Sequence, residues 1–258
     1  MKLPDFIIAG CMKAGTTGMF MNLSKHPNIT MSGIFGPLSE RQTQGTGTEM
    51  HYWSKLRKEG RDLDWYKSKF NGEVSGEKSP SYWIHMGALR QIFKHNPDTK
   101  FIVCVRHPVE RAHSHYMMNR LRTSSKAPFD PKHVKPVHVG LGKYYEKLNK
   151  CMLKIIPREN IHIVVSDWMK TNTTEEMMKV HKFLGINEIY IPTKEIIWRK
   201  LKVSLYDISQ DKDSYVIWSG HSKKKIDPKV REHYLEVYRP HNERLFNFLG
   251  YKIPEWSK

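Results

Sequence analysis

The chain has 258 residues, 39% of them hydrophobic, and its 43 Lys and Arg against 26 Asp and Glu give a formal net charge of +17. This apolar content predicts one substantial core and a single domain over residues 1–258, and the charge predicts a positive field that attracts anionic ligands. Three cysteines in separate segments, without metal-ligand spacing, argue against a disulfide framework and a zinc site. No apolar run approaches the length of a membrane span.

The chain begins with a short apolar run, residues 5–10 (DFIIAG), which ends in glycine. Apolar residues then recur at Met19, Phe20 and Leu23, before a stop at His26-Pro27. This pattern predicts a buried strand, a loop and a helix.

Strands and helices alternate along the rest of the chain. Residues 100–106 and 160–166 are continuous β-branched runs, typical of parallel strands that are covered on both faces, and residues 72–79 offer a shorter strand. Two long connections, 30–49 and 122–142, are expected to be functional or mobile loops. The alternation predicts an α/β fold, a three-layer sandwich around a central, mainly parallel sheet. Helical patterns occupy residues 86–94, 109–122, 144–156, 175–184 and 228–249.

The loop after the first strand has the glycine spacing of a phosphate-binding loop, Gly10-x-x-x-x-Gly15. Such a turn presents backbone N–H groups at the positive end of a helix dipole, where phosphate-like anions bind. Thr16 stands where nucleoside triphosphatases carry lysine, and the only lysine of the loop is Lys13. With Thr17 as a second hydroxyl donor, the loop suits one phosphate with another group attached and no metal. A plain strand-to-helix turn has the same spacing.

Three further stretches follow the loop segment, residues 4–29, in a telling order: EMHYW (49–53), EKSPSYW (77–83) and VRHPVERAHSHY (105–116). Together the four resemble the sulfotransferases that use 3′-phosphoadenosine 5′-phosphosulfate (PAPS). The resemblance is strongest to the heparan sulfate branch, the glucosaminyl N-sulfotransferases and 3-O-sulfotransferases. It extends over nearly the whole chain, because DLDWYKSKF, FLGI and SGHSKKKIDPK also look like that branch.

The resemblance implies that the first loop binds the 5′-phosphosulfate through Lys13, Ala14, Gly15, Thr16 and Thr17. In such enzymes the loop lysine lies beside the bridging oxygen, which gains negative charge as the S–O bond breaks. A cation in that place stabilises the transition state more than the ground state.

Arg106 follows a predicted buried strand, and ligands of open α/β sheets bind at the carboxyl ends of the strands. Pro108 begins a helix that carries Ser114 about two turns along. An arginine fork and a hydroxyl can hold a phosphate dianion, and the resemblance implies that Arg106 and Ser114 bind the 3′-phosphate. Arg106 taken alone could equally form a surface ion pair, and Arg111 is expected to be a charge on the helix surface.

Residues 219–229, SGHSKKKIDPK, resemble the third cofactor-binding loop of the family, which usually contains Lys-Gly-Arg. Gly220 is retained, but its flanking cations are not. The candidate cofactor-binding residues are therefore Gly220, His221, Lys223 and Lys224, with Lys223, Lys224 or Lys225 in place of the missing arginine. A solvated entry to the following helix is the alternative.

Transfer of a sulfuryl group needs a base that removes the proton of the acceptor. In the heparan sulfate branch the pattern Glu-x-His-Phe-Phe supplies it, which makes Glu49 the candidate base and Glu40 the fallback. His51 would share one side of an extended segment with Glu49 and orient its carboxylate or contact sulfate; a structural, hydrogen-bonded histidine is the alternative.

Lys78 matches a lysine that the family places near the transferring sulfuryl group, where a second cation would offset charge on its oxygens. The alternative is an ordinary salt bridge with Glu77 or Glu73. The paired cysteines of a late hairpin in the 3-O-sulfotransferases are absent from this chain, which leaves the acceptor open.

The preferred interpretation is a PAPS-dependent sulfotransferase that acts on a hydroxyl or amine and releases adenosine 3′,5′-bisphosphate. The alternative is a P-loop nucleotide kinase or hydrolase that uses Mg-ATP, with Asp167 as the magnesium-binding carboxylate. Thr16 cannot replace a lysine on the β- and γ-phosphates, and Asp167 fits the cap of a turn better.

A third interpretation is a basic module that binds nucleic acid, but the sequence has no basic stripe interleaved with aromatics on a known motif. The charge suits an anionic glycan as acceptor, while tyrosine, a lipid glycan and a small alcohol stay open, as does the oligomeric state. The sequence as given looks cytoplasmic, and the catalytic domain of a longer secretory-pathway protein would look the same.

Overall fold

The computed structural model of the chain describes residues 1–33, 49–186, 194–197, 214–217 and 225–257. Its elements are, in chain order, β1 (Phe6–Gly10), α1 (Thr16–Leu23), β2 (Ile29–Ser32), η2 (Tyr52–Leu56), α2 (Leu63–Lys67), β3 (Val74–Lys78), η3 (Tyr82–Ile84), α3 (Met86–His95), β4 (Lys100–Val105), α4 (Pro108–Arg122), α5 (Pro136–Gly140), α6 (Tyr144–Lys147), η4 (Leu148–Met152), η5 (Arg158–Asn160), β5 (Ile161–Val165), η6 (Trp168–Lys170), α7 (Thr173–Leu184), β6 (Lys194–Ile197), β7 (Ser214–Ile217), α9 (Pro228–Leu249) and η8 (Pro254–Ser257).

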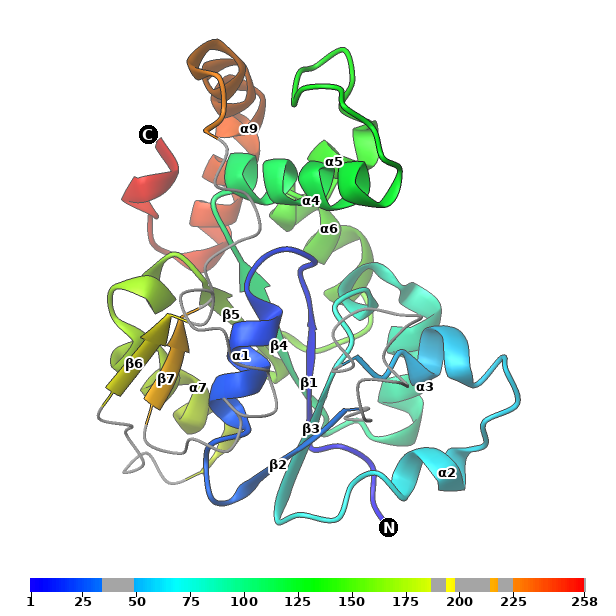
Figure 1. The fold of residues 1–258 in the computed structure, drawn as a ribbon. Helices are drawn as coiled ribbons and strands as arrows, with labels where there is room; N and C mark the ends of the chain where they lie inside the picture. The colour runs from blue at the N-terminus through cyan, green and yellow to red at the C-terminus, as the bar shows by residue number, and fades with distance from the viewer. Residues whose placement is uncertain (34–48, 187–193, 198–213, 218–224, 258) are drawn as a thin grey trace.

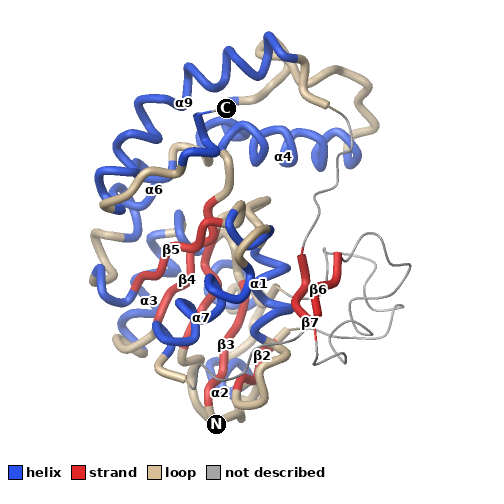
Figure 2. Tube along the Cα trace, turned by 90° about the vertical axis from the view of Figure 1, so that its left-hand side faces the viewer, coloured by secondary structure: helices blue, strands red, loops and turns tan. Residues whose placement is uncertain are grey.

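The main sheet has five strands in the order β2-β3-β1-β4-β5, and every neighbouring pair is parallel. Helix α1 lies over one face, and α3 lies over the other (Figures 1 and 2). The sheet is therefore the middle of three layers, and the predicted α/β sandwich is confirmed. Strands β6 and β7 form a separate parallel pair.

The continuous apolar runs form the strands at the centre of the sheet. All five residues of β1 are buried, as are all of β4 except its first residue. Such strands need cover on both faces, which explains why they contain no alternating polar residues. The three cysteines are buried with free thiols, as expected of core residues.

The predicted strands and most predicted helices are confirmed within a few residues, and α9 spans the full 228–249 despite Pro240 within it. The helix predicted over 144–156 is wrong in its continuity, because α6 gives way to the π-helix η4 at Leu148. Helix α5 lies inside the region predicted as the loop 122–142. Strand β2 was not predicted, since its sequence ITMS is short and mixed in polarity.

Because the five strands are parallel, their carboxyl ends share one edge of the sheet. Helices α4, α5 and α9 gather beyond this edge (Figure 1), and the loops that leave β1, β3, β4 and β5 start from it. The predicted ligand-binding residues of the described chain follow these strand ends, so the topology brings them to the same side. Among the described residues, none of the helices is both long and apolar enough to cross a membrane.

Candidate active site

The loop after β1 passes into α1 through Gly15, which has a φ of 88°. A Cβ atom there would lie 2.8 Å from Ser166 Oγ, so both the backbone conformation and the space require glycine. Ser166, directly after β5, donates a hydrogen bond to the carbonyl of Ala14. The residue that follows β5 thus holds the loop in place. Lys13, in the middle of the loop, is half-buried and has a φ of 68°.

Lys78 ends β3, and its side chain is completely buried. Its ammonium group donates to Thr17 Oγ1 at 3.0 Å and lies 3.4 Å from Glu49 Oε1. Burial lowers the pKa of Lys78, while the carboxylate of Glu49 opposes that shift. The expected alternative of a salt bridge with Glu77 or Glu73 is wrong, because the partner of Lys78 is Glu49.

Glu49 also accepts a hydrogen bond from the His51 ring, with 2.7 Å between Oε2 and Nε2. Burial by itself would raise the pKa of Glu49, but this hydrogen bond and the charge of Lys78 lower it to about 2. The carboxylate is therefore ionised at neutral pH. The extended segment expected from the sequence at His51 is wrong. His51 instead takes a left-handed conformation with a φ of 49° at the start of η2.

These groups form one set of contacts at the carboxyl edge of the sheet, which we call the strand-end cluster and define as residues 13–17, 49–51 and 77–79. The main chain of Met50 donates to the carbonyl of Lys78 at 3.2 Å, and Ser79 donates its N–H to the carbonyl of Ile8 at 3.0 Å. The segment of the candidate base is thereby attached to the end of β3, which is itself attached to β1. The fallback Glu40 lies outside the described residues.

Arg106 follows β4 at the same edge, and its main chain is held at both ends by Tyr144. The Tyr144 hydroxyl accepts from the Arg106 N–H at 3.2 Å and donates to the Arg106 carbonyl at 2.7 Å. The guanidinium lies 3.9 Å from Glu110, whose closer partner is Arg231 at 2.6 Å. A surface ion pair with Glu110 is therefore a weak constraint on Arg106, and Ser114 lies buried further along α4.

Arg111 is completely buried, so its prediction as a charge on the helix surface is wrong. Its guanidinium donates to the carbonyl of His138, which joins α4 to α5. Burial and, after it, the positive charges of Arg111, His138 and Lys13 lower the pKa of His115 to about 3. Arg111 thus places a permanent positive charge in the interior beside α4, and a buried cation favours an anion nearby.

Asp167, the magnesium ligand of the kinase alternative, is fully engaged with protein groups. Its carboxylate accepts from the His107 N–H at 2.7 Å and from Trp256 Nε1 at 3.0 Å, and it pairs with Lys170 at 3.0 Å. Asp167 stands at the N-cap position of the turn η6, as expected, but its side chain makes no capping hydrogen bond to that turn. Instead it holds His107, the residue on which α4 begins.

The candidates of the third loop, Gly220, His221, Lys223 and Lys224, lie outside the described residues. Their predicted role in cofactor binding stays a prediction.

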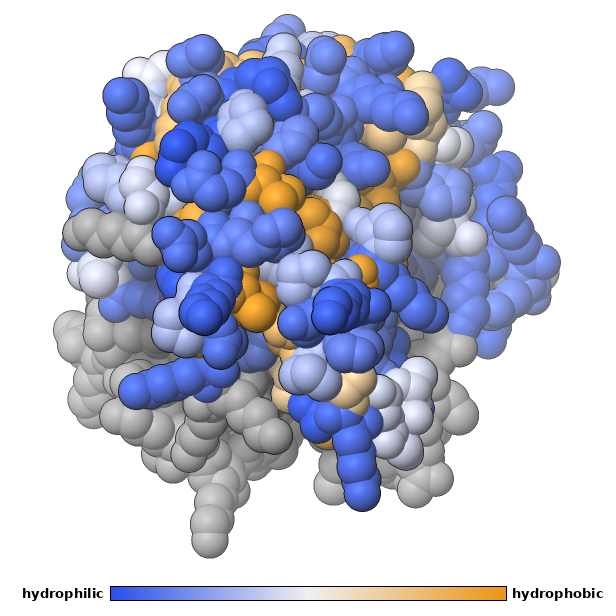
Figure 3. Space-filling view, turned by 90° about the horizontal axis from the view of Figure 1, so that it is seen from above, coloured by the Kyte–Doolittle hydropathy of each residue, from blue (hydrophilic) through white to orange (hydrophobic). Residues whose placement is uncertain are grey.

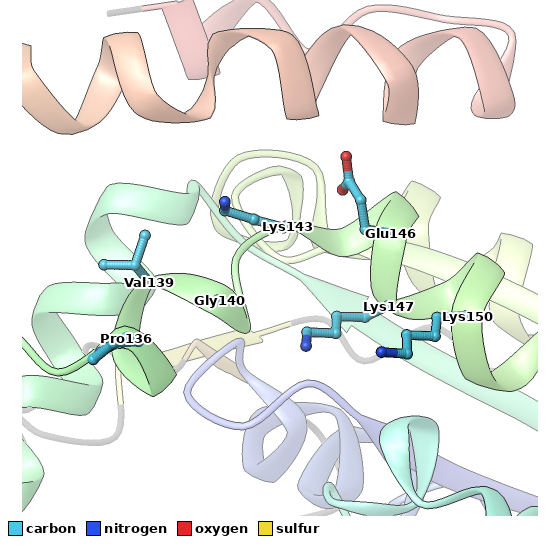
Figure 4. Close-up of a pocket in the computed structure, with 7 residues that line it drawn as sticks. All are labelled: Pro136, Val139, Gly140, Lys143, Glu146, Lys147 and Lys150. Atoms are coloured by element: carbon cyan, nitrogen blue, oxygen red, sulfur yellow. The ribbon is translucent and has the colours of Figure 1, made fainter.

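A pocket of about 400 Å³, which we call the lysine pocket, opens beside α5 and α6 (Figure 4). Its lining residues are Pro136, Val139, Gly140, Lys143, Glu146, Lys147 and Lys150. Glu146, the acidic member, already binds His241 at 2.6 Å and Arg244 at 2.5 Å, so it does not neutralise the lysines. Lys147 and Lys150 extend their ammonium groups in the same direction in this view.

The lysine pocket adjoins the strand ends, since Lys143 immediately precedes Tyr144, which binds the main chain of Arg106. The surrounding face, seen from above the sheet edge, is mainly hydrophilic with a few apolar side chains between (Figure 3). These lysines were not among the residues predicted from the sequence. Their spacing of three and four residues, 143, 147 and 150, was the available signal, because residues so spaced share one side of a helix.

Comparisons with known proteins agree with this arrangement. Residues 3–247 match the family described as "Sulfotransferase domain". Human heparan sulfate glucosamine 3-O-sulfotransferase 6 is 27% identical over 266 residues, which cover 96% of this chain and 72% of that protein. Human heparan sulfate glucosamine 3-O-sulfotransferase 3B1 is 26% identical, with 97% and 64% covered. A crystal structure of a sulfotransferase from Alicyclobacillus acidocaldarius shares the fold, with a TM-score of 0.70, 20% identity and 100% of both chains covered.

Proposed function

This chain belongs to the sulfotransferase family, and from that premise we propose that it transfers the sulfuryl group of PAPS to a hydroxyl or amine of an anionic acceptor. The observation that carries the proposal is the position of Lys78. Its ammonium group contacts the first loop, through Thr17 Oγ1, and the candidate base Glu49 at the same time. One buried cation thereby connects the place for the donor with the group that would activate the acceptor. The Mg-ATP alternative finds no support in the family or in Asp167.

For the donor, we assign the 5′-phosphosulfate to the loop residues Lys13 to Thr17. Their backbone N–H groups lead into α1, and Lys13 supplies the charge for the bridging oxygen. The 3′-phosphate is assigned to Arg106 and Ser114, at the end of β4 and on α4. Gly220, His221, Lys223 and Lys224 would complete the site.

In the proposed reaction the acceptor attacks sulfur in line with the bond to the bridging oxygen. The new S–O or S–N bond forms as the bridging S–O bond breaks, and adenosine 3′,5′-bisphosphate leaves with the electron pair of that bond. Glu49 takes the proton of the acceptor, while Lys13 and Lys78 stabilise the charge on the departing and the transferring oxygens.

A carboxylate with a pKa of about 2 is a weak base, and the contacts of Glu49 suggest how the donor would strengthen it. The ammonium group of Lys78, 3.4 Å from Glu49 Oε1, contributes to this low pKa. When the negative sulfuryl oxygens share the charge of Lys78, its hold on Glu49 weakens and the pKa of Glu49 rises toward the ordinary value for glutamate. The base would then gain strength only when the donor is bound.

For the acceptor, we propose an anionic glycan. Two similar proteins are heparan sulfate glucosamine 3-O-sulfotransferases by name, and the lysine pocket offers three ammonium groups beside the strand ends. Sulfate and carboxylate groups of such a chain would pair with these lysines while one hydroxyl or amine reaches Glu49.

Two measurements test the proposal. Adenosine 3′,5′-bisphosphate should raise the melting temperature, whereas Mg-ATP and nucleic acid should leave it within experimental error. Labelled PAPS, incubated with the protein and a panel of sulfated glycans, neutral glycans, peptides and small alcohols, should label the sulfated glycans most. Stabilisation by Mg-ATP alone, or no transfer to any glycan, would contradict the proposal.

A further inference from the structure

Glu77 is the second carboxylate of the strand-end cluster, and its environment is opposite to that of Glu49. It is completely buried in β3, and the structure shows no ion pair for it among the described residues. Tyr66 donates to Oε1 at 2.6 Å, and Ser79 donates to Oε2 at 2.9 Å. Burial raises the pKa of Glu77 to about 7, although these hydrogen bonds act in the opposite direction. A carboxylate in such a place is costly, which raises the question of what it does.

Ser79, one of the two partners of Glu77, also contacts His51, the residue whose ring binds the candidate base. Ser79 is also completely buried, and its Oγ accepts a hydrogen bond from the His51 N–H at 2.9 Å. A hydroxyl has one proton to donate, and a carboxyl oxygen that carries no proton can only accept. Because Ser79 gives its proton to Glu77, its lone pairs point toward the His51 N–H. Glu77 therefore takes the proton of Ser79 and leaves its lone pairs available to accept from the His51 N–H.

The main chain of His51 needs such support. Its φ of 49° is unusual for a residue other than glycine and persists only where neighbouring groups hold it. From this conformation the ring reaches Glu49 at 2.7 Å. Ser81 Oγ lies at the limit of hydrogen bonding to the other ring nitrogen, at 3.5 Å. The two ring contacts do not involve the His51 backbone N–H, whose hydrogen bond goes to Ser79.

We propose that Ser79, oriented by the buried Glu77, is a positioning residue for sulfuryl transfer. It holds His51 in the left-handed conformation from which the ring fixes the carboxylate of Glu49. The inference rests on the proposed function, because it takes Glu49 as the base. Neither Ser79 nor Glu77 touches the reacting atoms; they act through His51.

The chain offers a matched pair of variants. Ser79→Ala and Tyr66→Phe each remove one hydroxyl that donates to Glu77, but only Ser79→Ala also releases the His51 N–H. Both should lower the melting temperature. With Ser79→Ala, kcat should fall about 10- to 100-fold at an unchanged KM for PAPS, because a small displacement of a catalytic group costs this much. With Tyr66→Phe, kcat should stay within about threefold of wild type, and Ser79→Thr, which keeps the hydroxyl, should recover most of the loss.

The pH profile gives a second readout, which a purely structural role would not move. The hydrogen bond from His51 lowers the pKa of Glu49. Its loss in Ser79→Ala should move the acid limb of kcat/KM for the acceptor, measured at saturating PAPS, to higher pH, and Tyr66→Phe should leave that limb in place.

The failure of this inference is distinguishable from that of the proposed function. If Glu49→Gln abolishes transfer but Ser79→Ala and Tyr66→Phe lose equal activity with equal acid limbs, the positioning role is wrong and the base assignment stands. If Glu49→Gln keeps wild-type turnover, or wild type transfers no sulfuryl group from PAPS, the proposed mechanism fails and the role of Ser79 falls with it.

Discussion

The strand-end cluster and the lysine pocket both present cations at the same edge of the sheet, yet they hold them in different ways. Lys78 is completely buried and contacts Thr17 and Glu49, whereas Lys147 is half-buried and Lys150 is exposed. A buried charge has one geometry, which suits a reaction that tolerates little displacement. An exposed charge on a flexible stem can follow ligands of differing shape. The contrast suggests that chemistry and acceptor choice are carried by separate parts of the molecule.

The largest expected effect comes from the cluster. Glu49→Gln keeps the size of the side chain but removes the base, so kcat should fall about 10²- to 10⁴-fold. The dissociation constant of adenosine 3′,5′-bisphosphate, measured by calorimetry, should change little. Glu59→Gln, at an exposed glutamate, is the control and should behave like wild type. Equal turnover of the two variants would place the base elsewhere.

Gly15→Ala should come next, by damaging the loop without removing a charge. The new methyl group would meet Ser166 Oγ, in addition to the strain of a positive φ, so affinity for the bisphosphate should fall about 10- to 100-fold. Gly60 has a nearly identical φ of 89° but open space around it, which makes Gly60→Ala the matched control. If both variants bind the bisphosphate like wild type, the loop is not the donor site.

The lysine pocket should show a smaller and more selective effect. The double variant Lys147→Ala, Lys150→Ala should raise KM for a sulfated glycan about 3- to 10-fold, since each partly exposed ion pair contributes at most about 1 kcal/mol. KM for PAPS and kcat should be unchanged, and added salt should narrow the difference from wild type. Lys154→Ala, at an exposed lysine outside the pocket, is the control. If the double variant raised KM for PAPS instead, the proposal that the lysine pocket binds the acceptor and not the donor would be wrong.

The smallest effect concerns stability rather than activity. The pKa of Glu77 in the folded protein, about 7, exceeds the ordinary 4.5, so the folded state retains a proton that the unfolded state loses. The free energy of unfolding should therefore fall as pH rises from about 4.5 to about 7, by up to roughly 3 kcal/mol from this group. Denaturant melts of Glu77→Gln should lack this component, whereas exposed Glu73→Gln should retain it. Identical pH slopes in all three proteins would mean that Glu77 is not protonated in this range.

The strand-end cluster could be anticipated from sequence, and the lysine pocket could not. Parallel strands bring their carboxyl ends together, so short motifs after β1, β3 and β4 are placed by topology alone. The contacts of Lys78 with Glu49 were beyond prediction, because the neighbouring Glu77 was an equally plausible partner. The structure shows that the carboxylate of Glu77 accepts hydrogen bonds from Tyr66 and Ser79 instead.

Arg111 and helix α5 show where sequence reasoning fails. A charged residue on a helix is usually exposed, and nothing local in the sequence indicates that α5 and its His138 carbonyl cover Arg111. Helix α5 itself has only five residues, too few for a periodic pattern to emerge. Residues of α5 line the lysine pocket, so the pocket forms only where these long-range contacts place α5. The sequence alone therefore did not indicate that its lysines share one site.

Tyr144 ties the two regions together, because its hydroxyl grips both main-chain polar groups of Arg106 while the preceding residue, Lys143, lines the pocket. A single peptide bond joins Tyr144, which supports the proposed site of the 3′-phosphate, to Lys143, which lines the proposed acceptor site. If a nucleotide restricts the motion of Arg106, Tyr144 and the adjacent Lys143 should be restricted as well. Binding of either substrate should therefore reduce the entropy cost of binding the other. We therefore expect each substrate to lower the dissociation constant of the other by the same factor.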